Sequence, residues 1–493
     1  MKGGKENMST ELVSTGTSTE KTLSLKTLAM YSIGFAPSAV LCFNAFYIYY
    51  MYFMTDIAKI PAIIAGGISL FAIAWDAVSD PIIAYKSDNC RWKIGRRVPF
   101  MTIGVIVMTL SLVFTFTVFD LSVTGKSIYF VIWTLLFWTG ATMWDIPHNA
   151  LGAELTSKQS EREKLRIGTT IVDGIGLMFV VYIIPNLSDY LIKSTGNEPK
   201  GWQLTMVVIS LLALIIGLST CITLYKEEPK IDWEKRDAAN NGAAKKKVSQ
   251  TIKELFQLKP YKFLCITVVA VNIGSVCMQS AIVYFMTYLS GFTPAQQSMA
   301  LVCHYATHLI FGILIGSFLQ KKFGSRKIFI VGLSITIFAC FFFPNFASVT
   351  SLPMMILFLI MQSIGVRVLW LYCYIYAYGI SMLDDIKNKK RREGNVVGFM
   401  SLGLKMGAAI ATWLIGFVLQ RTGYDGNAVV QLSSAISGIR LLVGFIPVIF
   451  ISIGLYSIIK YPMRDHDIVN IEEAIKKRNE GLPYSIESFE HLM

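Results

Sequence analysis

The chain has 493 residues, of which 54% are hydrophobic and 16% charged, and its mean hydropathy is +0.53. A soluble globular protein carries about 25% charged residues, so this composition indicates a membrane protein. The formal net charge is +13, but the basic residues crowd into alternate short loops rather than one face or tail, which excludes nucleic acid as a partner. The eight cysteines form no Cys-x-x-Cys pair and are interpreted as packing residues, not as a zinc site or a disulfide framework.

Apolar stretches of about 20 residues, enough to cross about 30 Å of hydrocarbon, recur along the whole chain. We therefore expect an all-α membrane protein with twelve transmembrane helices in two six-helix bundles. The predicted spans are Leu28–Phe53, Ala62–Tyr85, Phe100–Phe119, Ile128–Leu151, Ile167–Leu191, Trp202–Tyr225, Phe263–Leu289, Gln296–Leu319, Ile328–Phe346, Leu352–Leu383, Val396–Leu419 and Ile436–Ile459.

The distribution of polar segments predicts the domain organisation and the orientation. Most Lys and Arg lie in the even-numbered connections, so both termini are predicted to be cytoplasmic in a multi-pass protein of the cell membrane. The expected parts are a cytoplasmic N-terminal segment (1–26), an N-terminal six-helix bundle (27–225), a cytoplasmic linker (226–260), a C-terminal six-helix bundle (261–460) and a cytoplasmic tail (461–493). Within the tail, Asp465 to Gly481 is predicted to form a short amphipathic helix.

Two carboxylates stand one helical turn apart in the second span, in Trp75-Asp76-Ala77-Val78-Ser79-Asp80-Pro81. Asp76 and Asp80 share a helix face and repel each other unless a cation or a proton sits between them. A charge in a membrane helix costs several kcal/mol, roughly 2.5–3.5 on insertion scales, so the pair predicts a site for a coupling cation. The competing interpretation is a salt bridge to a neighbouring helix.

The fourth span repeats this combination of an acid and a proline. Thr142 and Asp145 lie on one face, and Pro147 follows the acid as Pro81 follows Asp80. A proline leaves the carbonyl four residues back without its helical partner, and such oxygens beside carboxylates suit a hard cation such as Na⁺.

The first span is rich in tyrosine near its outer end. These residues are interpreted mainly as anchors at the membrane interface, namely Tyr47, Tyr49, Tyr50 and Tyr52.

The second half carries further ionisable and polar groups within its spans. Lys405 is expected either to neutralise one of the acids or to hold an anionic ligand, and Arg367 offers a bidentate donor on the same face as Trp370. Asp173 of the fifth span is either a ligand group or the partner of Arg367. Two polar residues of the seventh span suit hydrogen bonding to a polar solute or between helices, namely Asn272 and Gln279. His304 and His308, one turn apart, are interpreted as structural.

The motifs resemble the glycoside–pentoside–hexuronide:cation symporters of the major facilitator superfamily. The resemblance covers nearly the whole chain and rests on Thr55-Asp56, Trp75-Asp76-Ala77-x-x-Asp80-Pro81, Gly95-Arg96 with Pro99, Asp145-Ile146-Pro147, Glu161-Arg162 and Tyr284-Phe285-x-Thr287-Tyr288. It implies two six-helix bundles around a central cavity that move by alternating access. The family's cation site falls on Asp76, Asp80, Asp145 and Thr142, and two further family positions fall on Lys405 and Trp370.

The family's sugar-binding positions are replaced in this chain. The first-span aspartate falls on Val40, the fifth-span arginine on Thr170, and the tryptophan after Asp-Ile-Pro on Asn149. A site stripped of its hydrogen-bonding partners loses its former ligand, while Arg367 and Lys405 favour an acidic sugar or another organic anion. Neutralisation of these two cations by Asp173 and Asp145 would cancel that preference.

The leading prediction is a secondary active transporter that couples Na⁺ or H⁺ to symport of a small polar organic solute, such as a sugar, glycoside or acidic sugar. Asp76, Asp80 and Asp145 are the predicted Na⁺ ligands if sodium is the coupling ion. The predicted solute ligands are Lys405, Trp370, Asn149, Arg367, Asp173, Asn272 and Gln279. The alternatives are a sodium-dependent carrier of an amphipathic, lipid-like or other non-sugar solute and a non-transporting sensor. No enzyme motif is found, so no catalytic residue or cofactor is predicted, and the protein is expected to be a monomer in a lipid bilayer.

Overall fold

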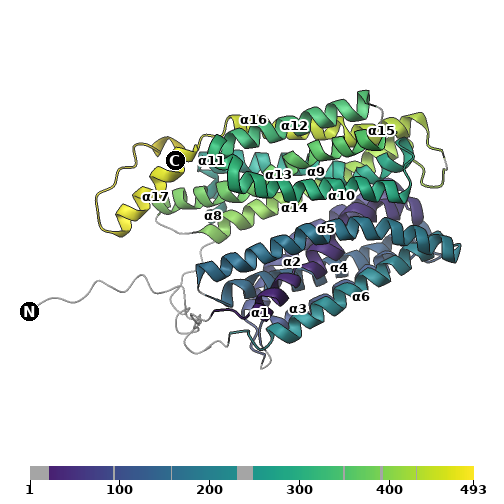
Figure 1. The fold of residues 1–493 in the computed structure, drawn as a ribbon, viewed down its shortest axis with the longest axis horizontal. Coiled ribbons are helices and arrows are strands. Elements are labelled where there is room, and N and C mark those ends of the chain that lie inside the picture. The colour runs from purple at the N-terminus through teal and green to yellow at the C-terminus, as the bar shows by residue number, and fades with distance from the viewer. Residues whose placement is uncertain are drawn as a thin grey trace, which may run out of the picture.

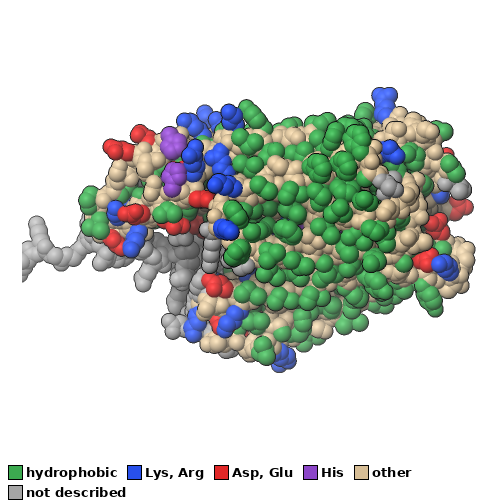
Figure 2. Space-filling view, turned by 45° about the horizontal axis from the view of Figure 1, so that its top comes forward, with side chains coloured by type: hydrophobic (Ala, Val, Ile, Leu, Met, Phe, Trp, Pro, Cys, Tyr) green, Lys and Arg blue, Asp and Glu red, His purple; other side chains and the backbone are tan. Residues whose placement is uncertain are grey.

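The computed structural model describes residues 22–92, 95–156, 158–229, 248–347, 350–388, 392–428 and 430–493. In this part of the chain, twelve helical segments are long and apolar enough to cross a membrane, which confirms the predicted all-α architecture. Figure 1 shows the first six spans, in purple to teal, as one bundle lying beside the bundle of the last six, in green to yellow. The space-filling view shows hydrophobic side chains over the middle of the molecule with Lys and Arg gathered at its two ends, as a bilayer requires (Figure 2).

The first bundle contains six spans, the first of which is irregular. That span runs from Leu25 to Tyr50 and comprises α1 (Leu25–Ile33) and two π-helical segments, η1 (Ala36–Cys42) and η2 (Ala45–Tyr50). A third π-helical segment, η3 (Phe53–Ile57), follows the end of the span. The other spans are α2 (Ala62–Asp88), α3 (Val98–Thr115), α4 (Val123–Glu154), α5 (Gln159–Thr195) and α6 (Glu198–Leu224).

The second bundle follows α8 (Val248–Phe256), a helix within the segment that we predicted to be a linker. Its spans are α9 (Lys259–Tyr284) with η4 (Phe285–Leu289), α10 (Pro294–Leu314) with η5 (Ile315–Leu319), α12 (Ser325–Phe346), α13 (Leu352–Asn388), α14 (Glu393–Arg421), and α15 (Ser433–Val443) with α16 (Phe445–Ile459). Short helices are α11 (Gln320–Phe323) and η6 (Glu490–Leu492), and the predicted tail helix is confirmed as α17 (Asp465–Asn479).

The first span departs from a regular α-helix for a local reason. Pro37 stands at the start of η1 and has no N–H to donate. The Asn44 side-chain amide instead donates to the carbonyls of Ala39 (2.8 Å) and Val40 (3.0 Å). These groups replace part of the regular ladder of this span, and π-type turns are common at functional positions of membrane helices.

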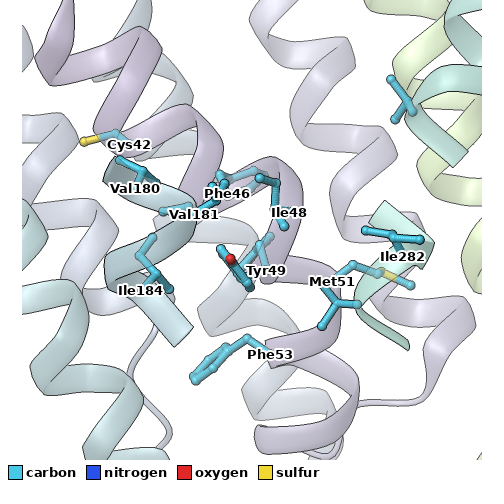
Figure 3. Close-up of a cluster of buried hydrophobic side chains, with 14 of the residues drawn as sticks. Cys42, Phe46, Ile48, Tyr49, Met51, Phe53, Val180, Val181, Ile184 and Ile282 are labelled. Atoms are coloured by element: carbon cyan, nitrogen blue, oxygen red, sulfur yellow. The ribbon is translucent and has the colours of Figure 1, made fainter. Parts of the chain in front are cut away.

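The tyrosines of the first span correct our sequence interpretation. Tyr49 and Tyr50 are 2% and 1% exposed, so they lie in the core of the first bundle and not at the membrane interface. Tyr49 lies among side chains of α5 that include Val181 and Ile184, next to Phe46 of η2 and Phe53 of η3 (Figure 3). The Tyr50 hydroxyl is hydrogen-bonded to Thr134 of α4 at 2.5 Å. Burial of these rings anchors the irregular span against its neighbours.

The two bundles meet along α2 with α14 and along α5 with α10. Small residues set the first crossing: a Cβ added at Gly416 of α14 would lie 2.3 Å from the carbonyl oxygen of Ala62 on α2, and Gly66 packs against the same glycine. Backbones this close leave no room for side chains. The crossing brings the carboxylates of α2 within reach of a side chain of α14. Asp76 and Lys405 each lie about three helical turns from the glycine contact, after Gly66 on α2 and before Gly416 on α14.

Candidate functional site

A lysine of the second bundle lies between the two acids of the first. The ammonium of Lys405 on α14 is 2.6 Å from Oδ2 of Asp76 and also donates to Oδ2 of Asp80. The side chain of Asp76 is 7% exposed, whereas those of Asp80 and Lys405 are 32% and 28% exposed. Lys405 thus forms an ion pair with each of the two acids. The cluster of two aspartates and one lysine has a net charge of −1 when all three are ionised.

Thr142 of α4 completes this arrangement from a third helix. Its hydroxyl lies 2.8 Å from Oδ1 of Asp76 and 3.2 Å from Oδ1 of Asp80. The hydroxyl of Ser79 instead donates to the backbone carbonyl of Asp76 at 3.1 Å. Helices α2 and α4 both continue through their prolines, Pro81 and Pro147, so the acids stay within helical segments.

Asp145 is the third predicted cation ligand and has a partner that the sequence did not suggest. The hydroxyl of Ser38, which directly follows Pro37 in η1, donates to its carboxylate. Asp145 interacts electrostatically with Asp76, Asp80 and Lys405. Among the described residues, no three His, Cys, Asp or Glu side chains gather closely enough to hold a metal ion, so a Na⁺ site made by the three acids stays a prediction.

Some of the predicted solute ligands are hydrogen-bonded to a neighbouring helix, and others are exposed. Asn272 donates to the carbonyl of Leu404 at 2.7 Å, and Gln279 donates to the Tyr305 hydroxyl at 2.9 Å, so both amides join neighbouring helices. Trp370 is 43% exposed. Asn149 is exposed and donates to its own helix at Asp145, 2.9 Å away.

Arg367 and Asp173 belong to different bundles and interact electrostatically without forming an ion pair. Asp173 is on α5 and Arg367 on α13, and their charges interact, but their charged atoms do not approach within the 4.0 Å of a salt bridge.

The two histidines of α10 differ in their hydrogen bonding. The buried Nε2 of His308 has no hydrogen-bond partner among the described residues. His304 has a structural role, as we expected, because its Nδ1 lies 2.9 Å from the carbonyl oxygen of Leu359.

A second set of polar contacts joins the bundles where the first span ends. We call it the latch: Thr55, Asp56, Tyr284, Tyr288 and Tyr424. Oδ1 of Asp56 accepts the hydroxyls of Tyr424 (2.5 Å) and Tyr288, and its Oδ2 accepts the Thr55 hydroxyl at 2.6 Å. Tyr284 lies 2.7 Å from the Thr55 hydroxyl. In the sequence, Thr55-Asp56, Tyr284 and Tyr288 stood out only as family motifs, and nothing indicated that they meet each other or Tyr424.

Burial governs the electrostatics of the latch. Asp56 is 4% exposed, and this burial raises the pKa of its carboxyl to about 6 although three hydroxyls and the Lys59 charge act in the opposite direction. Burial also raises the pKa of Tyr424, next to Asp56. Lys59 donates to the carbonyl of Gly426, which adds another contact between the bundles at this end. The latch therefore joins the two bundles at one end of the molecule through a buried carboxyl whose pKa is raised.

Known proteins match this architecture along nearly its full length. A family model described as MFS/sugar transport protein matches residues 30–465. The inner membrane symporter YicJ of Escherichia coli (strain K12) is 26% identical over 467 residues, covering 92% of this chain and 95% of that protein. A glucuronide carrier protein homolog of the same organism is 22% identical over 461 residues, covering 92% and 96%. The crystal structure of a D-xylose–proton symporter aligns with a TM-score of 0.60 at 15% identity, covering 89% of this chain and 96% of that one. The family model covers most of the chain, and the twelve membrane helices in two bundles agree with it. The chain therefore belongs to the MFS/sugar transport protein family of membrane symporters.

Proposed function

We propose that this protein couples the movement of Na⁺ or H⁺ down its gradient to the uptake of a sugar or glycoside, by alternating access between its two bundles. The family description, a relative named as a putative glycoside/cation symporter and another named as an isoprimeverose transporter favour a sugar-type solute and active transport over a non-transporting sensor. A lipid-like solute, as in the name of one relative, a sodium-dependent lysophosphatidylcholine symporter of Danio rerio, is the less favoured alternative. The proposed cation ligands are Asp76, Asp80, Asp145 and Thr142. We also retain the expectations of a monomer and of cytoplasmic termini.

The observation that carries the proposal is the position of Lys405 between Asp76 and Asp80. The acids belong to the first bundle and the lysine to the second, so the ion pairs connect the two moving parts. With its net charge of −1, the cluster attracts one further monovalent cation. A Na⁺ or a proton that arrives there competes with the ammonium for the same oxygens, because carboxylate and hydroxyl oxygens are the ligands of hard cations. Binding of the coupling ion would thus loosen the connection between the bundles.

The test is uptake into proteoliposomes under an imposed Na⁺ gradient or pH gradient, with a panel of labelled neutral glycosides and hexuronides. The gradient that drives accumulation identifies the ion. Asp80→Asn should abolish accumulation but preserve solute exchange at equal concentrations, since exchange does not require the ion gradient. Asp120→Asn, at an exposed acid between α3 and α4, is the matched control and should behave as wild type. Normal accumulation in Asp80→Asn vesicles would refute the role of the acid pair.

A further inference from the structure

Arg367 lies against a glycine of the neighbouring helix, and a side chain at that glycine would displace the guanidinium. A Cβ added at Gly312 of α10 would lie 2.5 Å from Nε and Nη2 of Arg367 and 2.7 Å from its Cζ. The guanidinium thus lies against the bare backbone of α10. The guanidinium makes no hydrogen bond with the described residues, and its Nε is buried. An arginine within a membrane protein normally pairs with an acid, a carbonyl or water, so its donors are available to a ligand.

The acceptor that faces this donor comes from the other bundle. Asp173 of α5 interacts electrostatically with Arg367, yet neither an ion pair nor a hydrogen bond joins the two described side chains. Asp173 also interacts with Tyr305 of α10, whose hydroxyl already accepts from Gln279. Trp370, three residues after Arg367 on α13, exposes 43% of its surface and offers an apolar face on the same side of the helix.

We propose that Asp173 and Arg367 form the two ends of a subsite that binds neighbouring hydroxyl groups of a neutral sugar ring, with Trp370 against the apolar face of the ring. A guanidinium only donates and a carboxylate only accepts, whereas a hydroxyl does both. A pair of hydroxyls placed between them satisfies both groups at once. This inference rests on the proposed sugar symport.

The charges favour a neutral ligand and revise the expectation of an organic anion. Lys405, the other cation named for an anionic ligand, is held by two carboxylates. The positive charge of Arg367 interacts with the negative charge of Asp173. A hexuronate would bring its negative charge toward Asp173, and both cations nearby already have their charge balanced by acids, which makes its binding unfavourable at low dielectric. A neutral sugar leaves the balance of charges unchanged.

The experiment measures uptake kinetics in proteoliposomes for 4-nitrophenyl hexosides and pentosides and for the matching 4-nitrophenyl hexuronides. For the best neutral glycoside, Arg367→Gln and Asp173→Asn should each raise KM about 10- to 100-fold, as expected for loss of a charged hydrogen-bonding partner, with little change in Vmax. The double variant should raise KM no more than the single variant with the larger effect does, because one end of the subsite contributes little to binding without the other.

A glycine substitution separates this role from a structural one. Gly312→Ala keeps both charges but displaces the guanidinium, so it should raise KM as Arg367→Gln does. Gly67→Ala is the matched control, since nothing lies within 4 Å of the Cβ it adds, and it should leave KM unchanged. Gly312→Ala thus keeps the inference testable if a charge variant does not fold.

The outcomes distinguish the two proposals. If the wild type accumulates none of the glycosides under either gradient, the proposed function is wrong. If it accumulates a neutral glycoside and both charge variants keep the wild-type KM, only the subsite is wrong. A wild-type preference for the hexuronide that disappears in Arg367→Gln would show an anion site and would also overturn the inference.

Discussion

Acidification should strengthen closure of the latch, because the buried Asp56 holds a proton more tightly when the latch is closed. With the latch contacts formed as in this structure, burial raises the pKa of the carboxyl to about 6, and when the contacts open the pKa should return toward 3.8 as the group meets water. The closed state therefore binds more protons between these values. The added stability of closure is fully present below pH 3.8 and is lost as the pH rises through about 6. From pH 8 to pH 5 the ratio of closed to open should rise about tenfold, or about 1.4 kcal/mol.

Distance measurements between spin labels at the latch end would test this. Leu121→Cys, in the loop before α4, and Val430→Cys, in the loop after α14, place labels on different bundles at residues that are 45% and 83% exposed. In a variant whose native cysteines are replaced, the population with the shorter distance should grow on acidification. Asp56→Asn should abolish this response, since the amide does not titrate, whereas Asp120→Asn should retain it. A response that persists in Asp56→Asn, or a shift to longer distances at pH 5, would refute the reasoning.

Three further predictions concern packing and orientation. Gly416→Ala should destabilise the protein by about 1–3 kcal/mol in detergent and lower its melting temperature, because the new Cβ would meet the Ala62 carbonyl at 2.3 Å; unchanged melting would show that α2 and α14 separate without penalty. Arg392→Gln should destabilise by about 3–5 kcal/mol, since it leaves the fully buried Asp384 without its cation at 2.6 Å, and an exposed-site variant such as Lys193→Gln should not. If the termini are cytoplasmic, an impermeant thiol reagent should label Val430→Cys but not Trp92→Cys in intact cells, and the reverse pattern would invert the orientation.

The fold could be predicted from the sequence because the bilayer sets the length of each apolar stretch. All twelve spans were found, with differences at their ends, for example in α4, which runs from Val123 to Glu154 where Ile128–Leu151 was predicted. The break at Gly444, which divides the last span into α15 and α16, was not predicted. The irregular first span was not predicted, because hydropathy counts apolar residues and does not register which carbonyl Asn44 engages. The linker prediction missed α8, whose Leu255 is fully buried, because a short polar segment takes its structure from what it packs against.

The site was only partly predictable, since helical spacing reports neighbours on one helix and not on two. The spacing placed Asp76 and Asp80 on one face, and the lone Lys405 suggested the partner that the structure shows. The partnership of Ser38 with Asp145 and the contact of Gly312 with Arg367 depend on how separate helices approach each other. The sequence offers only weak signals for these contacts. Ser38 follows a proline within a span, and Gly312 lies on the helix that carries the two histidines. Contacts of this kind need a structure.

The polar contacts between the bundles suggest an order of events during transport. Removing one partner from a buried ion pair costs about 3–5 kcal/mol, because the other charge is left unpaired. If Lys405 left Asp76 and Asp80 before a cation arrived, two carboxylates would remain beside each other with no positive charge between them. If the cation arrives first, the acids stay neutralised while the lysine withdraws, and the barrier to separating the bundles falls. We therefore expect the coupling ion to bind before the bundles separate at this depth, and this order would link solute movement to the ion.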